Sequence, residues 1–257
     1  MTFLIAALLF ASIFFSAPDN AMDSELRFQK PGLSHPLGTD NFGRDIFSRI
    51  ISGCKYTIVI AVCTVLGAVI AGSILGLAAG YFGGLCDEII MRLMDVISSF
   101  PGILFALVMV ALFDNSPFTL FSALTILFIP SFTRIIRSGA LQFKNRDFIL
   151  AEKLLGANFA RIMFIHILPN LMPSLISAAV LGLSNAVLAE TAMSYLGLGI
   201  QPPVSSWGRM LSEAQNFLFN APWYALAPGI FIMLTVIAFH FLGEGLRRHF
   251  GEKNASA

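Results

Sequence analysis

The side chains that most often bind metals are widely scattered in this chain. Its four histidines belong to no His-x-His or Cys-x-x-His arrangement, and its three cysteines include no close pair. Ten methionines are dispersed in the same way. The sequence therefore predicts no metal site and no disulfide framework. The histidines and cysteines concerned are His35, His166, His240, His249, Cys54, Cys63 and Cys86.

Motifs for nucleotide hydrolysis and covalent catalysis are absent from the sequence. It contains no Gly-x-x-x-x-Gly-Lys-[Ser/Thr] phosphate loop, which an ATP-hydrolysing chain of that class needs. It also contains no nucleophile elbow and no helical His-Glu-x-x-His segment. We therefore expect no catalytic residue and no cofactor on this chain, and any step that consumes ATP must take place on another subunit.

Two acidic residues, Asp95 and Glu190, lie near long apolar runs, each close to a predicted helix end. Two such acids do not form the intramembrane carboxylate chain of an ion-coupled carrier. Glu190 has two interpretations that the sequence leaves open: a proton relay, or a structural hydrogen bond at a helix end. Glu88, Arg92 and Asp95 share a helix face at i, i+4 and i+7. They form either a polar entry to a span or a contact with a partner.

The composition identifies the environment in which these residues must be positioned. Of 257 residues, 56% are hydrophobic and 12% are charged, whereas soluble domains carry roughly 25% charged residues. The same balance excludes a disordered chain. With 16 basic against 15 acidic residues, no basic field is available to bind nucleic acid. The chain is therefore predicted to be a polytopic protein of the lipid bilayer.

Six stretches of the sequence are free of charged residues and close to the ~20 residues that a spanning helix needs. Each is continuously apolar, whereas the strands of a membrane barrel alternate. The predicted fold is therefore all-α, with one transmembrane domain over residues 1–257. Its helices are expected at about 2–17, 57–81, 94–113, 117–135, 168–190 and 222–243.

The first apolar stretch, Met1–Ala17, has a second interpretation as a cleaved signal peptide, because it is short and ends in small residues. No Lys or Arg precedes its apolar core, and secretory signals normally carry one there. We therefore expect this stretch to be retained as a span.

The basic residues predict the orientation in the membrane. Six spans place both termini on one side, and that side holds ten of the sixteen Lys and Arg residues. Because cytoplasmic loops carry the excess of basic residues, both termini are predicted to be cytoplasmic. The long loop over 19–55 then lies outside, and the loop over 138–166 lies in the cytoplasm.

The cytoplasmic loop contains a short amphipathic pattern. Phe148, Ala151, Leu155 and Phe159 recur at helical spacing, which predicts a helix that ends or breaks near Gly156. Its apolar face suits the groove of another protein. Headgroup binding by an interfacial helix is the alternative, and the pattern alone does not separate the two.

The second predicted span carries small residues four apart. Thr64, Ala68, Gly72, Gly76 and Gly80 form one stripe along the helix. Small residues at this spacing let another helix approach closely. The stripe is therefore predicted to pack against a helix, either of this chain or of a partner subunit.

The segment that starts at Gly156 and continues after nine residues with His166-Ile-Leu-Pro169 resembles the motif of the permease subunits of ATP-binding cassette (ABC) importers. The usual motif begins with Glu-Ala-Ala. This chain has Leu150-Ala151-Glu152 in that region, so the acidic residue is displaced and one alanine is kept.

Further segments resemble the permeases of the peptide and nickel importers, in the order of that family over residues 35 to 250. The similarity is closest to the second of the two permeases in such systems. The segments are His35-Pro-Leu-Gly-Thr-Asp40, Gly43-Arg-Asp-Ile-Phe-Ser-Arg49, Ser99-Phe-Pro101, His166-Ile-Leu-Pro-Asn170, Ser194-Tyr-Leu-Gly-Leu-Gly199, Trp207-Gly208 and Met210-Leu211.

The resemblance implies a type I ABC importer permease fold and a subunit of the cytoplasmic (inner) membrane. Its implied partners are a homologous second permease, two ABC ATPases that hold ATP and Mg²⁺, and an extracytoplasmic solute-binding protein. The implied solutes are peptides or nickel and other metal chelates, moved by alternating access. A secondary carrier or channel that works without an ATPase is the alternative.

The resemblance also assigns candidate sites. The helix of the cytoplasmic loop corresponds to the coupling helix that contacts the ATPase, with candidates Ala151, Glu152, Leu155, Gly156, His166 and Pro169. The outer segments imply contacts of the outer loop and the binding protein, with candidates Gly38, Asp40, Gly43, Arg44, Asp45, Trp207 and Gly208.

Overall fold

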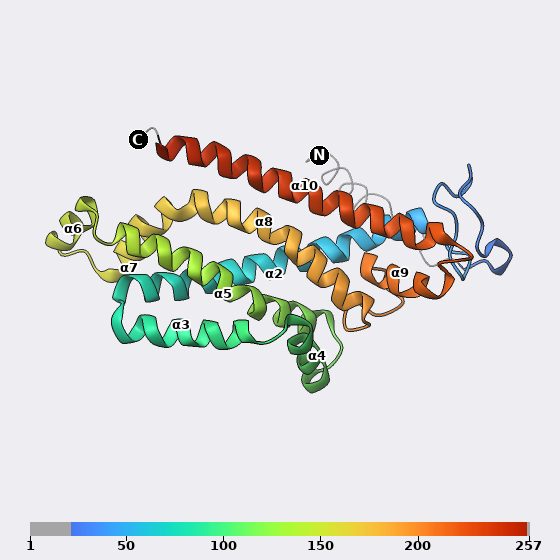
Figure 1. The fold of residues 1–257 in the computed structure, drawn as a ribbon, viewed down its shortest axis with the longest axis horizontal. Helices are drawn as coiled ribbons and strands as arrows, with labels where there is room; N and C mark the ends of the chain where they lie inside the picture. The colour runs from blue at the N-terminus through green and yellow to red at the C-terminus, as the bar shows by residue number, and fades with distance from the viewer. Residues whose placement is uncertain (1–21, 256–257) are drawn as a thin grey trace.

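In the computed structural model the chain is a bundle of long helices with a short helix at each end (Figure 1). The structure describes residues 22–255, with side chains up to residue 250. The span predicted over 2–17 lies outside the described residues. The α-helices are α2 (Ile46–Phe82), α3 (Gly84–Ser99), α4 (Gly102–Phe113), α5 (Pro117–Phe143), α6 (Asp147–Leu154), α7 (Phe159–Arg161), α8 (Leu168–Tyr195), α9 (Trp207–Ala214) and α10 (Pro222–Ala255).

The predicted all-α class is confirmed, since residues 22–255 contain helices and no strand beyond an isolated bridge. Short helical turns complete the described chain: η1 (Ser24–Leu26), the π-helical segment η2 (Ile162–Ile167) and η3 (Gln215–Phe217). Among the described residues, four helices are long and apolar enough to cross a membrane. They are α2, α5, the continuous stretch Phe159–Tyr195 and α10.

Helix α2 is the longest element, and it runs from the α9 end of the bundle to the α6 end (Figure 1). It begins at Ile46, inside the loop predicted over 19–55. Asp45 caps it by accepting a hydrogen bond from the Ser48 backbone N–H at 2.8 Å, and Ile46 and Ile50 are fully buried. Nearby charged residues interrupt the apolar run in the sequence, but in the structure they lie within this helix.

The helix predicted over 94–113 differs from the structure, which has two helices there. Helices α3 and α4 meet at an angle of 90°. Phe100 and Pro101 between them adopt extended backbone conformations, with ψ of 132° and 124°. A residue before proline is disfavoured in the helical region, so the Phe100–Pro101 pair ends α3. The two helices count together as a fifth span only if a bent pair is accepted as one.

The glycine stripe of α2 faces α5 of the same chain. A Cβ atom at Gly72 would lie 2.7 Å from the Cβ of Phe132, and one at Gly76 would lie 2.6 Å from the Thr133 carbonyl oxygen. At Gly80 it would lie 2.6 Å from the Cβ of Ala140. The two helices therefore touch along their length at a separation that only glycine permits.

Candidate functional site

The predicted coupling segment forms one end of the bundle (Figure 1). Helix α6 ends at Leu154, and Gly156 follows with a φ of +81°. The backbone N–H groups of Leu155 and Gly156 close the last turn by bonding to the carbonyls of Ala151 and Lys153. A left-handed glycine after the last helical turn is a common helix stop, so the helix breaks where the sequence pattern indicated.

The tip of α6 exposes apolar side chains. Leu154 is 89% exposed and Leu155 is 82% exposed, and Leu150 is 43% exposed. Only Ile149 of this helix is buried. The sequence interpretation selected Leu155 but missed Leu154 and Leu150. The run of adjacent leucines before Gly156 was the available signal.

Aromatic contacts attach the last turn of α6 and the start of α7 to the bundle. The ammonium group of Lys153 lies 5.3 Å from the ring centre of Tyr81, in a cation–π arrangement. The rings of Phe82 and Phe159 are 5.6 Å apart. Since Tyr81 and Phe82 belong to the last turn of α2, the segment from α6 to α7 packs directly on the end of that helix.

Two of the predicted coupling residues face each other across the loop. The Nε2 atom of His166 lies 3.6 Å from the Oε2 atom of Glu152, and both side chains are partly exposed. His166 belongs to the π-helical segment η2, which leads without interruption into α8, where Pro169 occupies the first turn. The structure thus joins the end of α6 to the start of α8 through this pair.

The opposite end of the bundle is organised around buried charges. The Arg49 guanidinium donates to Asp40 Oδ2 at 2.7 Å and to Glu213 Oε2 at 2.9 Å. Arg44 donates to the same two carboxylates at 2.6 and 3.2 Å. The Tyr224 hydroxyl donates to Glu213 Oε2 at 3.0 Å. We call these five residues the charge cluster.

The charge cluster connects segments far apart in the sequence. Asp40 and Arg44 belong to the loop before α2, and Arg49 belongs to the first turns of α2. Glu213 comes from α9, and Tyr224 comes from the start of α10. Burial by itself would raise the pKa of Glu213, but the charges of Arg49 and Arg44 hold it below its ordinary value. Glu213 is therefore an anion that the two arginines compensate.

Several other predicted outer-loop residues pack the same end. The indole N–H of the buried Trp207 donates to the Ile50 carbonyl at 2.9 Å. Gly38 has a φ of +77°, and a Cβ there would lie 2.8 Å from the Trp223 ring. Asp45 caps α2 and pairs with His35 at 2.9 Å. Gly43 and Gly208 are likewise pressed against neighbouring backbone.

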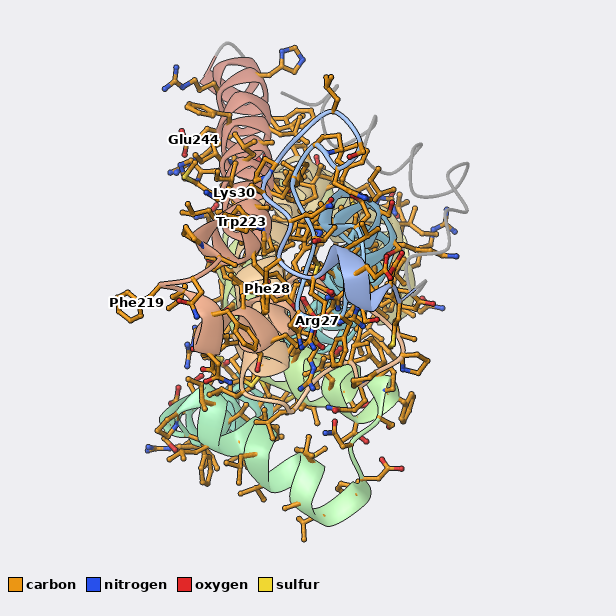
Figure 2. All side chains as sticks on the ribbon, turned by 90° about the vertical axis from the view of Figure 1, so that its right-hand side faces the viewer. Arg27, Phe28, Lys30, Phe219, Trp223 and Glu244 are labelled. Carbon is orange, nitrogen blue, oxygen red and sulfur yellow. The ribbon has the colours of Figure 1, made fainter. Side chains whose placement is uncertain are left out.

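Most of the outer-loop candidates are therefore turned inward. Asp40, Trp207 and Arg44 are buried. The apolar side chains that are fully exposed in this part of the chain are Leu33 and Phe219, which the sequence analysis did not select. Figure 2 looks onto this end and shows Phe219 pointing away from the bundle, while Phe28 and Trp223 lie over it.

Glu190 lies inside the structure, not at a helix end. It is fully buried within α8, and its Oε1 atom accepts a hydrogen bond from Ser194 at 2.6 Å. Its Oε2 atom has no hydrogen-bond partner among the described residues. The contact with Ser194, one turn further along α8, suits a structural role.

The polar face of α3 divides between two partners. Arg92 lies 4.0 Å from Glu88 on the exposed surface, whereas Asp95 pairs with Arg134 of α5 at 2.9 Å.

No group of three or more His, Cys, Asp or Glu residues within the described chain is arranged to hold a metal ion.

Known transport proteins resemble this chain over most of its length. A family profile described as "Binding-protein-dependent transport system inner membrane component" matches residues 72–253. The dipeptide transport system permease protein DppC of Alkalihalophilus pseudofirmus is 40% identical over 96% of this chain and 81% of its own length. The glutathione transport system permease protein GsiD of Pectobacterium atrosepticum is 39% identical over 89% of this chain and 76% of its own length.

Solved structures resemble the fold at lower identity. A chain of the inward-facing MetNI methionine ABC transporter superposes with a TM-score of 0.66 at 17% identity, covering 79% of this chain and 97% of its own length. A chain of an amino acid ABC transporter superposes with a TM-score of 0.56 at 19% identity, covering 79% of this chain and 93% of its own length.

Proposed function

The chain belongs to the family of binding-protein-dependent transport system inner membrane components, and from this premise we propose that it is the membrane-spanning permease subunit of an ATP-driven importer of short peptides. The predicted type I ABC importer permease fold is confirmed by its all-α architecture and its solved structural neighbours. Membership of the family also places the chain in the inner membrane as a multi-pass protein.

The observation that carries the proposal is the exposed tip of α6. The eight-residue helix α6 has one buried side chain, and its last residue Leu154 and the following Leu155 are each more than 80% exposed. Such a helix suits a groove in a partner protein. The ABC ATPase is the proposed partner, with Leu154 and Leu155 as its central contacts beside Ala151, Glu152 and Gly156.

The proposed mechanism is alternating access. Two ATPases hold ATP and Mg²⁺, and their closure moves α6. The contacts of Lys153 with Tyr81 and of Phe159 with Phe82 pass this movement to α2, and the His166–Glu152 pair passes it to α8. A homologous second permease completes the pathway. In this arrangement the α6 end and both termini are cytoplasmic.

The α9 end then faces outward, toward a solute-binding protein. The motif residues Asp40, Arg44, Trp207 and Gly208 support that surface from inside. They keep the outer loop in one shape, so that the binding protein meets a rigid face. We propose peptides as the solute because the relatives described above are named for dipeptides and glutathione. A nickel chelate is the other solute that the sequence resemblance implied.

The test is uptake by the reconstituted complex of both permeases, both ATPases and the binding protein. We expect ATP-dependent accumulation of a labelled dipeptide and none of chelated nickel. Deletion of Lys153–Gly156 is expected to abolish uptake while the subunit still inserts and the binding protein still docks. Full uptake by the deletion variant would refute the coupling role, and uptake by the purified chain alone would support a carrier or channel.

A further inference from the structure

A cavity of about 820 Å³ opens between α5, α6 and α8 at the α6 end of the bundle. A second cavity of about 460 Å³ continues from it toward the C-terminal part of α10, and Ile135 and Ser174 line both. We propose that these two cavities, here called the α5–α8 cavity, are a transient binding site for a short peptide on its way to the cytoplasm. This inference rests on the proposed function and adds the residues of this chain that the peptide touches.

The walls of the α5–α8 cavity carry uncharged polar side chains at helical spacing. Ser138 and Gln142 are one turn apart on α5, and Asn170 and Ser174 are one turn apart on α8. All four are exposed. The side chains of Ser138, Gln142 and Ser174 make no hydrogen bond to another described residue. Polar groups without protein partners are costly in hydrocarbon, so this face of the two helices must contact water.

The neighbouring face of α8 has the opposite character. Met172 and Ile176 are 40% and 39% exposed and lie two residues to either side of Ser174. In a helix, positions two apart point in clearly different directions. One helix therefore presents a polar face to the cavity and an apolar face to the surroundings, which is the arrangement expected where a membrane helix lines an aqueous route.

The chemistry of the cavity suits the parts that all peptides share. Hydroxyl and carboxamide groups both donate and accept hydrogen bonds, as the amides of a peptide backbone require. The lining also includes Arg146, Asp147 and Arg247, whose charges complement a terminal carboxylate and a terminal ammonium. The volume of each of the two cavities, about 820 and 460 Å³, lies in the range of roughly 300–1,000 Å³ that is typical of small-ligand pockets. Such a site binds short peptides whatever their side chains.

The experiment places single cysteines on the two faces of α8. Cys54, Cys63 and Cys86 are first replaced by serine or alanine. Ser174→Cys then reports on the cavity, and Ile176→Cys is the matched control on the apolar face. The complete complex in proteoliposomes is treated from the ATPase side with a charged, membrane-impermeant thiosulfonate, which reacts with thiolates in water. Labelling, dipeptide uptake and ATP hydrolysis are measured on the same sample.

We expect the reagent to label Ser174→Cys and to leave Ile176→Cys unlabelled. The adduct at position 174 should reduce dipeptide uptake to roughly a tenth, because it fills space that the peptide needs, while ATP hydrolysis continues. A dipeptide at saturating concentration should slow the labelling. Ser138→Cys on α5 provides an independent second position, and it decides the question if the Ser174→Cys complex does not assemble.

Three results would overturn the inference. Equal labelling of positions 174 and 176 would show that the polar face of α8 is no more accessible to water than its apolar face. No labelling in the assembled complex would show that another subunit fills the cavity. Complete labelling with unchanged uptake would place the cavity off the peptide route. Failure of the proposed function looks different: the unlabelled complex would import no dipeptide with ATP, although the labelling pattern could still be measured.

Discussion

The two ends of the bundle are stabilised in opposite ways. At the α9 end, four charged side chains and a tyrosine hydroxyl are bonded to one another inside the protein, and Asp40 and Arg49 are almost completely buried. At the α6 end, a short helix exposes its leucines and is attached by a few aromatic contacts. The charges at one end are paired within the described chain, whereas the apolar side chains at the other are left uncovered by it.

The two ends differ because buried charges and exposed apolar groups have different requirements for their surroundings. A buried charge is tolerated only when its partners are fixed in good geometry, so the charge cluster requires the loop, α2, α9 and α10 to stay together. Exposed apolar groups make no such demand on their own chain. They contribute free energy only when a partner removes them from water, as the proposed ATPase would do at the α6 end.

The largest effect is expected at the charge cluster. Arg49→Ala leaves Asp40 and Glu213 without a main counter-charge inside the protein, and it should lower the free energy of unfolding by about 3–5 kcal/mol. Guanidinium titration of the purified subunit in detergent, followed by tryptophan fluorescence, measures the loss. Arg92→Ala is the control, because Arg92 is exposed and reaches Glu88 only at 4.0 Å. Equal losses for both variants would remove the distinction between the two kinds of charge.

The next effect concerns the helix that joins the two ends. Gly76→Leu forces a large side chain against the backbone of α5 and should destabilise the subunit by about 3 kcal/mol. Gly245→Leu on α10 is the control, since a Cβ there meets nothing within 4 Å. The same titration compares them. If Gly76→Leu folds normally and loses only its contact with the second permease, α2 does not pack on α5 as described.

A smaller effect is expected at the tip of α6. Leu154→Ala should weaken binding of the ATPase by about 1–2 kcal/mol, because the deleted methyl groups are buried only in the complex. Stability of the isolated subunit should not change. The dissociation constant for the purified ATPase measures the effect. Leu112→Ala on α4 serves as control, because Leu112 is 72% exposed and α4 lies far from α6 (Figure 1); a matching loss there would argue against a local docking contact.

The smallest effect is a response of the α9 end to acid. Because Glu213 has a lowered pKa in the folded protein, its contribution to stability is fully present above the ordinary value of 4.5 and is lost as the pH falls through the folded pKa. Hydrogen exchange of α9 should therefore accelerate below about pH 4.5. The acceleration should be absent in Glu213→Gln. Identical pH profiles for the two proteins would contradict the assignment.

The sequence predicted a helix correctly where the local composition alone determines its position. Long charge-free runs correspond to α5, α8 and α10, and the break at Gly156 agrees with its left-handed backbone. The start of α2 was missed because Arg49 interrupts the apolar run. Its partner Glu213 is 164 residues away in the sequence, and a single sequence does not show that the two charges meet.

The bend between α3 and α4 and the tip of α6 were missed for different reasons. Pro101 is a helix-breaking residue, but the apolar run continues on both sides of it. The prediction followed the hydropathy of this run and gave one helix over 94–113. At α6, the pattern indicated an amphipathic helix but not which leucines remain uncovered, since exposure depends on how the helix sits on α2 and α5. The α5–α8 cavity depends in the same way on the meeting of two helices.

The unbroken length of α2 has a consequence for how the two ends influence each other. At about 1.5 Å per residue, its 37 residues extend roughly 55 Å, more than the ~40–45 Å of a whole bilayer. No proline, bulge or turn interrupts it between the capping Asp45 and Phe82. Under the proposed orientation, a tilt of α2 imposed at the α6 end would therefore reach the α9 end as a rigid-body movement, and a protein docked there would respond to nucleotide binding on the far side of the membrane.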